Sequence, residues 1–168
     1  MTTCAQQFGA ATPFSLENVA LAFACFAKPE TYVVGDLYEP ERHDYEEMLG
    51  GLPRELLEVA NFGTVAWGPL HDLTPQATAY LLPRLMELAC SQARDKSGDL
   101  FMTHFVMNVS EGPSCTRFSL LTPHHCAAVA EFLDHLAAQH GALIERDCLD
   151  DVLAEGRLNW RSNSAQNG

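Results

Sequence analysis

The strongest constraint on the fold is a Thr-Pro pair followed by a long stretch of apolar residues at helical spacing. Threonine can cap the start of a helix, and proline fits the first helical position because no backbone N–H is needed there. After Thr122-Pro123, apolar side chains recur every three or four residues as far as His140. Phe132 lies at the centre of this stripe and is expected to be buried. Gly141 follows, where a left-handed residue commonly ends a helix.

A second pair, Thr74-Pro75, repeats the signal and predicts a helix that runs to about Ala93. Pro83 lies inside this helix. Because proline lacks an N–H and its ring clashes with the preceding turn, a kink or break is expected near Leu82. The two long helices predict a mainly α-helical fold: a single compact domain of about six helices, with at most one short strand pair.

Shorter patterns complete the expected organisation. Further helices are expected over residues 15–27, 43–49, 53–60, 99–108 and 149–155, with one short strand at Tyr32-Val33-Val34. Three regions follow: a loose N-terminal arm over residues 1–13, the helical domain over 14–160, and a disordered tail over 161–168.

The charge balance limits the classes of partner. The 168 residues carry 22 acidic and 10 basic side chains, a formal net charge of −12. This balance excludes a uniformly basic nucleic-acid footprint and disfavours attraction to an anionic membrane. The longest apolar stretch, Val19–Ala27, is too short to span a bilayer and follows Glu17, where a signal peptide would carry positive charge. We therefore expect a cytoplasmic protein that binds neither nucleic acid nor membranes.

Six cysteines are present, and no two have the C-x-x-C spacing of a zinc or thiol-redox site. A chain of this size can bury a conventional core, so it needs no disulfides. Cys25, Cys90 and Cys126 lie in apolar helical patterns, where a free thiol behaves as a small hydrophobic group. Cys115 lies in a loop-like segment and is expected to be the most accessible thiol. A catalytic role for it would require a nearby base, and no local motif supplies one.

Several short motifs occur in a distinctive order. Phe62 to Leu70 reads FGTVAWGPL, Ala79 to Met86 reads AYLLPRLM, and Ala128 to Leu133 reads AVAEFL. This order resembles a family of small acidic bacterial proteins, a domain of unknown function, with a Trp-x-x-Leu segment, a Tyr-Leu-Leu-Pro helix and a closing Phe-Leu helix. The resemblance covers roughly residues 14–136 and implies a bacterial source and a mostly helical domain. It implies no catalytic residue.

Trp67 lies in an irregular segment ahead of the helix that contains Pro83. The simpler expectation is that its indole packs into the kink and seals the core. The alternative is a recognition role, in which Trp67 and the turn from Tyr80 to Pro83 line a pocket, since tryptophan is a frequent anchor for partners.

His124, Glu131 and His135 form the best candidate metal set, because all three fall along one stripe of a predicted helix. His124 and Glu131 are nevertheless about 10 Å apart along the helix axis. One ion with ligand bonds near 2 Å cannot bridge that span without another chain segment. The sequence also lacks a phosphate-binding glycine loop and a hydrolase nucleophile elbow. We expect neither a bound metal nor another cofactor.

Most of the negative charge lies in two short segments. Residues 36–47 contain six acids and one base, and residues 145–155 contain five acids and one base. Solvated surface is the simpler explanation, but such segments also steer basic partners. The residues expected to bind a partner are Asp36, Glu39, Glu41, Asp44, Glu46, Glu47 and Trp67.

The function favoured by these features is a non-catalytic protein–protein interaction domain with an acidic binding face. One alternative is an immunity- or antitoxin-like protein that neutralises a basic toxin. The other is a small hydrolase or metal-dependent enzyme that uses Cys115 or the region of His124, Glu131 and His135. No sequence signal predicts an oligomeric state.

Overall fold

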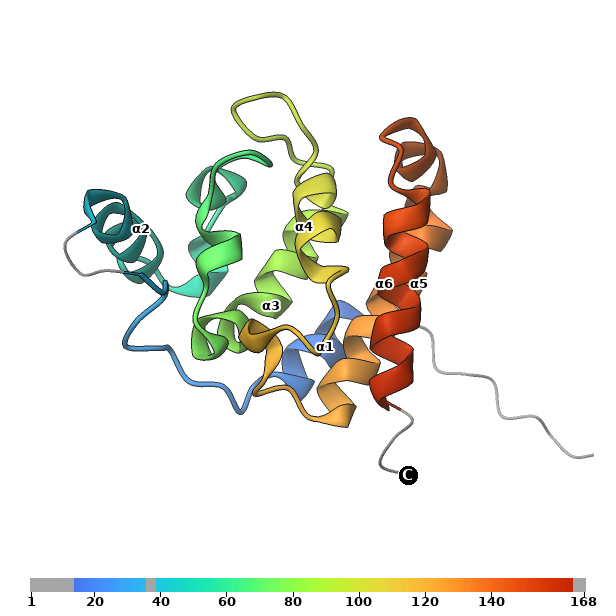
Figure 1. Ribbon diagram of the computed structural model, residues 1–168, viewed down its shortest axis with the longest axis horizontal. Coiled ribbons are helices and arrows are strands. Elements are labelled where there is room, and N and C mark those ends of the chain that lie inside the picture. The colour runs from blue at the N-terminus through green and yellow to red at the C-terminus, as the bar shows by residue number, and fades with distance from the viewer. Residues whose placement is uncertain (1–13, 36–38, 165–168) are drawn as a thin grey trace, which may run out of the picture.

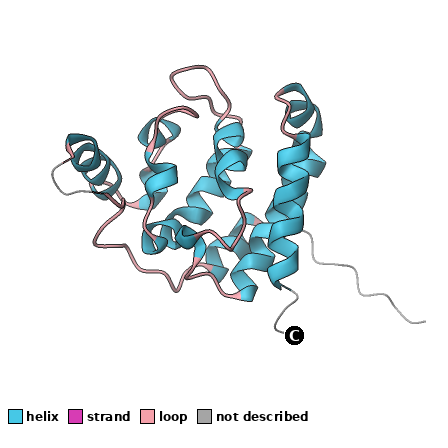
Figure 2. Ribbon diagram, in the orientation of Figure 1, coloured by secondary structure: helices cyan, strands magenta, loops and turns pink. Residues whose placement is uncertain are grey.

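The computed structural model describes residues 14–35 and 39–164, and these residues form a helical fold (Figure 1). No β-strand occurs among them (Figure 2), and only two isolated antiparallel bridges form, Val33–Leu73 and Arg94–Leu100. The predicted mainly α-helical fold is therefore confirmed, and the strand expected at residues 32–34 is reduced to one bridge. Within the described residues, no helix is long and apolar enough to cross a membrane. The expected arm over residues 1–13 lies outside the described part.

The α-helices are α1 (Leu16–Ala22), α2 (Pro40–Gly50), α3 (Pro75–Cys90), α4 (Phe101–Val109), α5 (Pro123–Arg146) and α6 (Asp150–Ser164). Four short 3-10 helices lie between them: η1 (Arg54–Leu56), η2 (Val59–Phe62), η3 (Pro69–Asp72) and η4 (Thr116–Phe118). The helix expected over residues 53–60 is thus replaced by η1 and the start of η2. The helix expected over 99–108 is confirmed as α4.

The α1 helix ends at Ala22, five residues before its predicted end, and the helical pattern is lost at Ala24, whose N–H donates to the Leu21 carbonyl at 3.2 Å. In a longer helix the N–H of Phe26 would donate to the Ala22 carbonyl. Instead the His125 imidazole hydrogen-bonds that carbonyl at 3.0 Å, and the Phe26 N–H donates to Phe23 at 3.2 Å. A side chain 103 residues away in the chain therefore satisfies a carbonyl at the end of α1.

The α3 helix begins as predicted, with the Thr74 hydroxyl accepting a hydrogen bond from the Ala77 N–H at 3.1 Å. It continues without interruption through Pro83, so the predicted kink does not split it. A proline at this position leaves the Ala79 carbonyl without its helical donor. At the next carbonyl, that of Tyr80, the Arg54 guanidinium donates at 2.9 Å and so attaches η1 to this part of α3.

The α5 helix begins at the predicted Thr-Pro pair, and its capping box consists of Thr122 and His125. The first helical segment of α5 ends at a kink at His140 (φ −124°, ψ 21°), where the sequence predicted the end, but a second helical segment then continues to Arg146. Gly141 is not left-handed. The left-handed residue that follows α5 is Cys148, with φ 55°.

The α6 helix is longer than the segment predicted over residues 149–155, and it includes four residues assigned to the disordered tail. It lies against α5 (Figure 1), and Asp134 of α5 accepts hydrogen bonds from Arg157 and Arg161. The Trp160 side chain is fully buried, and its indole N–H donates to the Val109 carbonyl at 2.8 Å. These contacts with α4 and α5 hold the helix well beyond residue 155.

A continuous cluster of buried apolar residues extends from Val19 of α1 to Trp160 of α6. Phe132 lies at its centre and is fully buried, as predicted. The α2 helix contributes little to this core, because Leu49 is its one buried residue. Figure 1 shows α2 at one end of the long axis, and apart from Leu49 its residues are exposed or half-buried.

Candidate functional site

Trp67 lies on the surface, with 70% of its area exposed. The expectation that its indole packs into a kink at Pro83 is therefore wrong. Pro83 is itself buried within an uninterrupted α3, so no opening forms there for an indole. A large exposed aromatic side chain is the residue type most enriched at binding hot spots. Trp67 is thus the starting point for a candidate interaction site.

A closed turn presents Trp67. The Thr64 N–H donates to the Trp67 carbonyl at 2.6 Å, and the Trp67 N–H donates to the Thr64 hydroxyl at 3.1 Å. Gly63 has φ 74°, and a Cβ on it would lie 2.2 Å from the Trp67 carbonyl oxygen. A Cβ on Gly68 would lie equally close to the Phe62 carbonyl oxygen. Both glycines are needed for this close approach, so the turn cannot relax easily and the indole is held outward.

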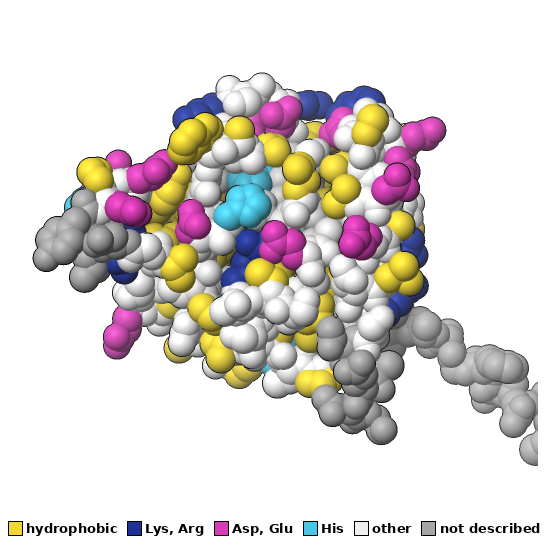
Figure 3. Space-filling view, in the orientation of Figure 1, with side chains coloured by type: hydrophobic (Ala, Val, Ile, Leu, Met, Phe, Trp, Pro, Cys, Tyr) yellow, Lys and Arg dark blue, Asp and Glu magenta, His cyan; other side chains and the backbone are white. Residues whose placement is uncertain are grey.

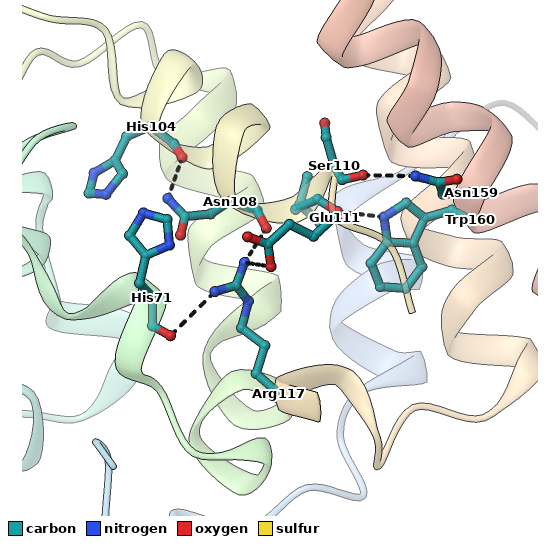
Figure 4. A network of polar contacts seen from close by, with 9 residues as sticks. His71, His104, Asn108, Ser110, Glu111, Arg117, Asn159 and Trp160 are labelled. Carbon is teal, nitrogen blue, oxygen red and sulfur yellow. Dashed lines mark hydrogen bonds and ion pairs between the residues drawn. The ribbon is translucent and has the colours of Figure 1, made fainter. Parts of the chain in front are cut away.

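An arginine clamp fixes the segment that follows the turn. The Arg117 side chain is only 8% exposed. It donates to the carbonyls of His71 in η3 (3.3 Å) and Asn108 in α4 (2.5 Å), and it pairs with Glu111 at 2.8 Å (Figure 4). The Trp67 turn is therefore attached through η3 to the body of the protein. Sequence reasoning missed Arg117, because two of its three partners are backbone carbonyls that leave no motif.

Most acidic residues in and just before α2 are exposed to solvent, but one of them binds the protein's own backbone. Glu39, Glu41, Asp44 and Glu47 are exposed. Glu46 is half-buried, and its carboxylate accepts the backbone N–H groups of Tyr32 and Val33, each at 2.9 Å. Its main contacts are thus within the protein. Asp36 lies outside the described residues.

The two acidic segments do not form one face. Figure 1 shows α2 at one end of the long axis and the turn between α5 and α6, which carries residues 145–155, towards the other. On the face shown in Figure 3, acidic side chains are likewise spread across the molecule and do not gather in one patch. Of the two segments, the α2 segment is the one that shares a hollow with Asp72 of η3, the helix that follows the Trp67 turn.

A hollow of about 140 Å³ lies between α2 and η3. Its charged lining residues are three acids and one base, namely Glu39, Glu41, Asp72 and Arg42. Asp72 ends η3, and Trp67 lies two residues before η3 begins. Because a 3-10 helix rises by about 2 Å per residue, this helix spans roughly 8 Å. The exposed indole and the acidic hollow therefore lie at the two ends of one short helix.

The candidate metal set does not assemble. His124 and Glu131 line a groove of about 590 Å³ between α1 and α5, and both side chains are exposed. The His135 ring instead stacks on Phe14, with the ring centroids 4.5 Å apart. In the described part of the chain, no three His, Cys, Asp or Glu residues are grouped in a way that could hold a metal ion.

The described cysteines are free thiols, and two differ from their predictions. Cys115 was expected to be the most accessible thiol, but it is half-buried and two other thiols are exposed, so that prediction is wrong. Cys25 is exposed because α1 ends before it, so the expectation of a buried thiol there is wrong. Cys148 is also exposed, Cys90 and Cys115 are half-buried, and Cys126 is buried. Burial raises the pKa of the Cys90 and Cys126 thiols. Cys4 lies outside the described residues.

One thiol lies beside an imidazole, but the pair is poorly suited to catalysis. The Cys25 sulfur is 3.8 Å from Nε2 of His125. Nδ1 of that ring accepts the Thr122 N–H at 3.1 Å, so Nε2 carries the proton and donates to the Ala22 carbonyl. Burial also lowers the pKa of His125. The imidazole would have to give up a capping bond before it could take a proton from Cys25.

His104 gives a testable pH dependence. Its side chain is 1% exposed, and burial, followed by the nearby His71, lowers its pKa from 6.5 to about 4, while Asp95 acts in the opposite direction. The unfolded chain binds a proton on this residue at higher pH than the folded chain. The free energy of unfolding should therefore fall between pH 6.5 and pH 4, by about 3 kcal/mol from His104 alone.

Chemical denaturation of the wild type and of His104→Leu across this pH range would measure the effect. The variant should lose less stability on acidification. Parallel curves for the two proteins would contradict a neutral, buried His104.

No protein-family model matches the chain, and no curated protein or solved structure matches it. The resemblance to a family of acidic bacterial proteins therefore stays a prediction. The candidate site rests on geometry alone: an exposed tryptophan on a closed turn, separated by one short 3-10 helix from a hollow whose lining includes three acids and one arginine.

Proposed function

We propose that this chain is a non-catalytic protein–protein interaction domain that binds its partner through the Trp67 turn. The observation that carries the proposal is the indole itself, exposed over 70% of its area on a turn locked by two glycines and two hydrogen bonds to Thr64. Exposing a tryptophan to water is unfavourable, and a rigid turn lowers the entropy lost when a partner covers it. Both properties favour an anchor for binding.

The neighbouring charges favour a basic partner. Glu39, Glu41 and Asp72 line the hollow at the far end of η3, and Asp44 and Glu47 add exposed carboxylates on α2. Carboxylates at this distance would attract Lys and Arg side chains, and the face of an indole also binds such cations. The proposed partner therefore carries basic side chains that face the acids. It also carries either a pocket that holds the Trp67 indole or a cationic side chain that packs on the face of that indole.

A photo-crosslinking amino acid placed at position 67 would test the proposal in cells of the source organism. The matched control is position 158, where Leu158 is 64% exposed but lies on α6. We expect one dominant crosslinked protein from position 67 that is absent from position 158. Identical products from both positions, or none from position 67, would contradict the proposed site.

The identified partner then allows a test of the charge contribution. Reversing Asp44 and Glu47 to lysine, or Glu145 and Glu155 to lysine, changes the net charge from −12 to −8 in either case. Only the α2 reversals should slow association strongly, and rising salt should reduce the difference because it screens charges beyond about 8–10 Å. Equal effects of the two pairs would show that only net charge matters. Glu46 is left unchanged because its carboxylate holds the backbone at Tyr32 and Val33.

A further inference from the structure

A small cavity lies in the core between α3 and α4. Its volume is about 20 Å³, and its apolar lining includes Leu82, Phe105 and Phe118. Every residue that lines it is buried, so it lies in the interior. By the same measure of volume, a single water molecule needs roughly 10–15 Å³. The cavity is therefore large enough for one water molecule and too small for most other ligands.

Two buried oxygens belong to residues that line this cavity. The hydroxyl oxygen of Thr78 and Oδ1 of Asn108 have no hydrogen-bond partner among the described residues. The orientation of the Asn108 amide is set by its other atom, because Nδ2 donates to the His104 carbonyl at 2.9 Å (Figure 4). Oδ1 is thus left as an acceptor. A buried polar atom without a partner costs free energy, which makes a bound donor favourable at this site.

We propose that the cavity is a binding site for a single structural water molecule that bridges Thr78 and Asn108. Water suits both groups, since it can donate to the amide oxygen while exchanging a second hydrogen bond with the hydroxyl. Purely apolar cavities of this kind stay dry, whereas those with polar partners hold water. The backbone carbonyl of Asn108 already accepts from Arg117 at 2.5 Å. The water would therefore link α3 to the residue on which the arginine clamp rests, whatever partner the Trp67 turn binds.

Water-to-protein nuclear Overhauser effects in a labelled sample would test the site, with the methyl groups of Val109 as reporters because Val109 also lines the cavity. We expect a negative effect, typical of a long-lived water, in the wild type. Thr78→Val, which keeps the shape but removes the hydroxyl, should lose this signal. Thr78→Ser, which keeps the hydroxyl, should retain it.

A dry cavity would give no such signal at Val109 in the wild type, and that result would overturn the proposal. An undiminished signal in Thr78→Val would also overturn it, because the bridge requires the hydroxyl. A crystal structure of the wild type provides a test that does not depend on how the variants fold. It should show a water molecule within hydrogen-bond distance of both oxygens.

Discussion

Replacing Phe132 by alanine is expected to lower the free energy of unfolding by roughly 3–5 kcal/mol. The Phe132 ring is fully buried, and it packs edge-to-face on Phe105 with centroids 5.3 Å apart and against Phe14 at 5.7 Å. Truncation removes apolar contacts and leaves a cavity that its helical neighbours cannot easily fill. Since domains are stable by only about 5–15 kcal/mol, much of the native stability should be lost.

Denaturant titration followed by circular dichroism would measure this change. The matched control is Leu158→Ala, which truncates a side chain that is 64% exposed and should change stability by about 0.5 kcal/mol or less. A Phe132→Ala protein as stable as this control would contradict the packing of α5 in the core.

Replacing Arg117 by methionine is expected to cost about 2–4 kcal/mol, although methionine fills a similar volume. The change removes donors from the carbonyls of His71 and Asn108 and a partner from Glu111. Asn108 is buried, so water cannot easily replace the lost donor to its carbonyl. The same variant should also loosen η3. In a Trp160→Phe background, where Trp67 is the remaining tryptophan, fluorescence should report greater motion of its indole.

Thermal unfolding and time-resolved anisotropy would check both effects. Arg146→Met is the control, because Arg146 is half-exposed and forms its ion pair with the adjacent Asp147 at the end of α5. It should leave both readouts nearly unchanged. If Arg117→Met also left them unchanged, the clamp would not position the Trp67 turn.

Short sequence motifs correctly predicted where the two long helices begin, because a helix start depends on neighbouring residues. Thr74-Pro75 and Thr122-Pro123 begin α3 and α5 as expected, since capping and proline geometry involve only neighbouring residues. The apolar stripe of α5 also placed Phe132 correctly in the core. Helix starts and buried stripes could therefore be predicted from the sequence.

The errors arise where a distant contact decides the outcome. The pattern predicted the break of α5 at His140, but it did not predict the second helical segment that follows as far as Arg146. The turn that presents Trp67 depends on the close approach of Gly63 and Gly68 to neighbouring backbone carbonyls. The apolar periodicity of the sequence does not predict that geometry. Glu46 looks like any other acid of its segment, but the fold brings it against the backbone at residues 32 and 33. Such contacts join elements far apart in the chain, so sequence patterns within one element cannot predict them.

The contact between α1 and α5 has a consequence for the order of events during synthesis. Ala22 leaves the ribosome 103 residues before His125, the residue that binds its carbonyl. At about 5–20 residues per second, the Ala22 carbonyl must wait roughly 5–20 s for His125, whereas α5 and α6 follow each other closely and can pair as soon as both have emerged. We therefore expect the C-terminal end of α1 to become native only after the start of α5 has emerged, and α6, which is made after α5, to be the last helix that can pack.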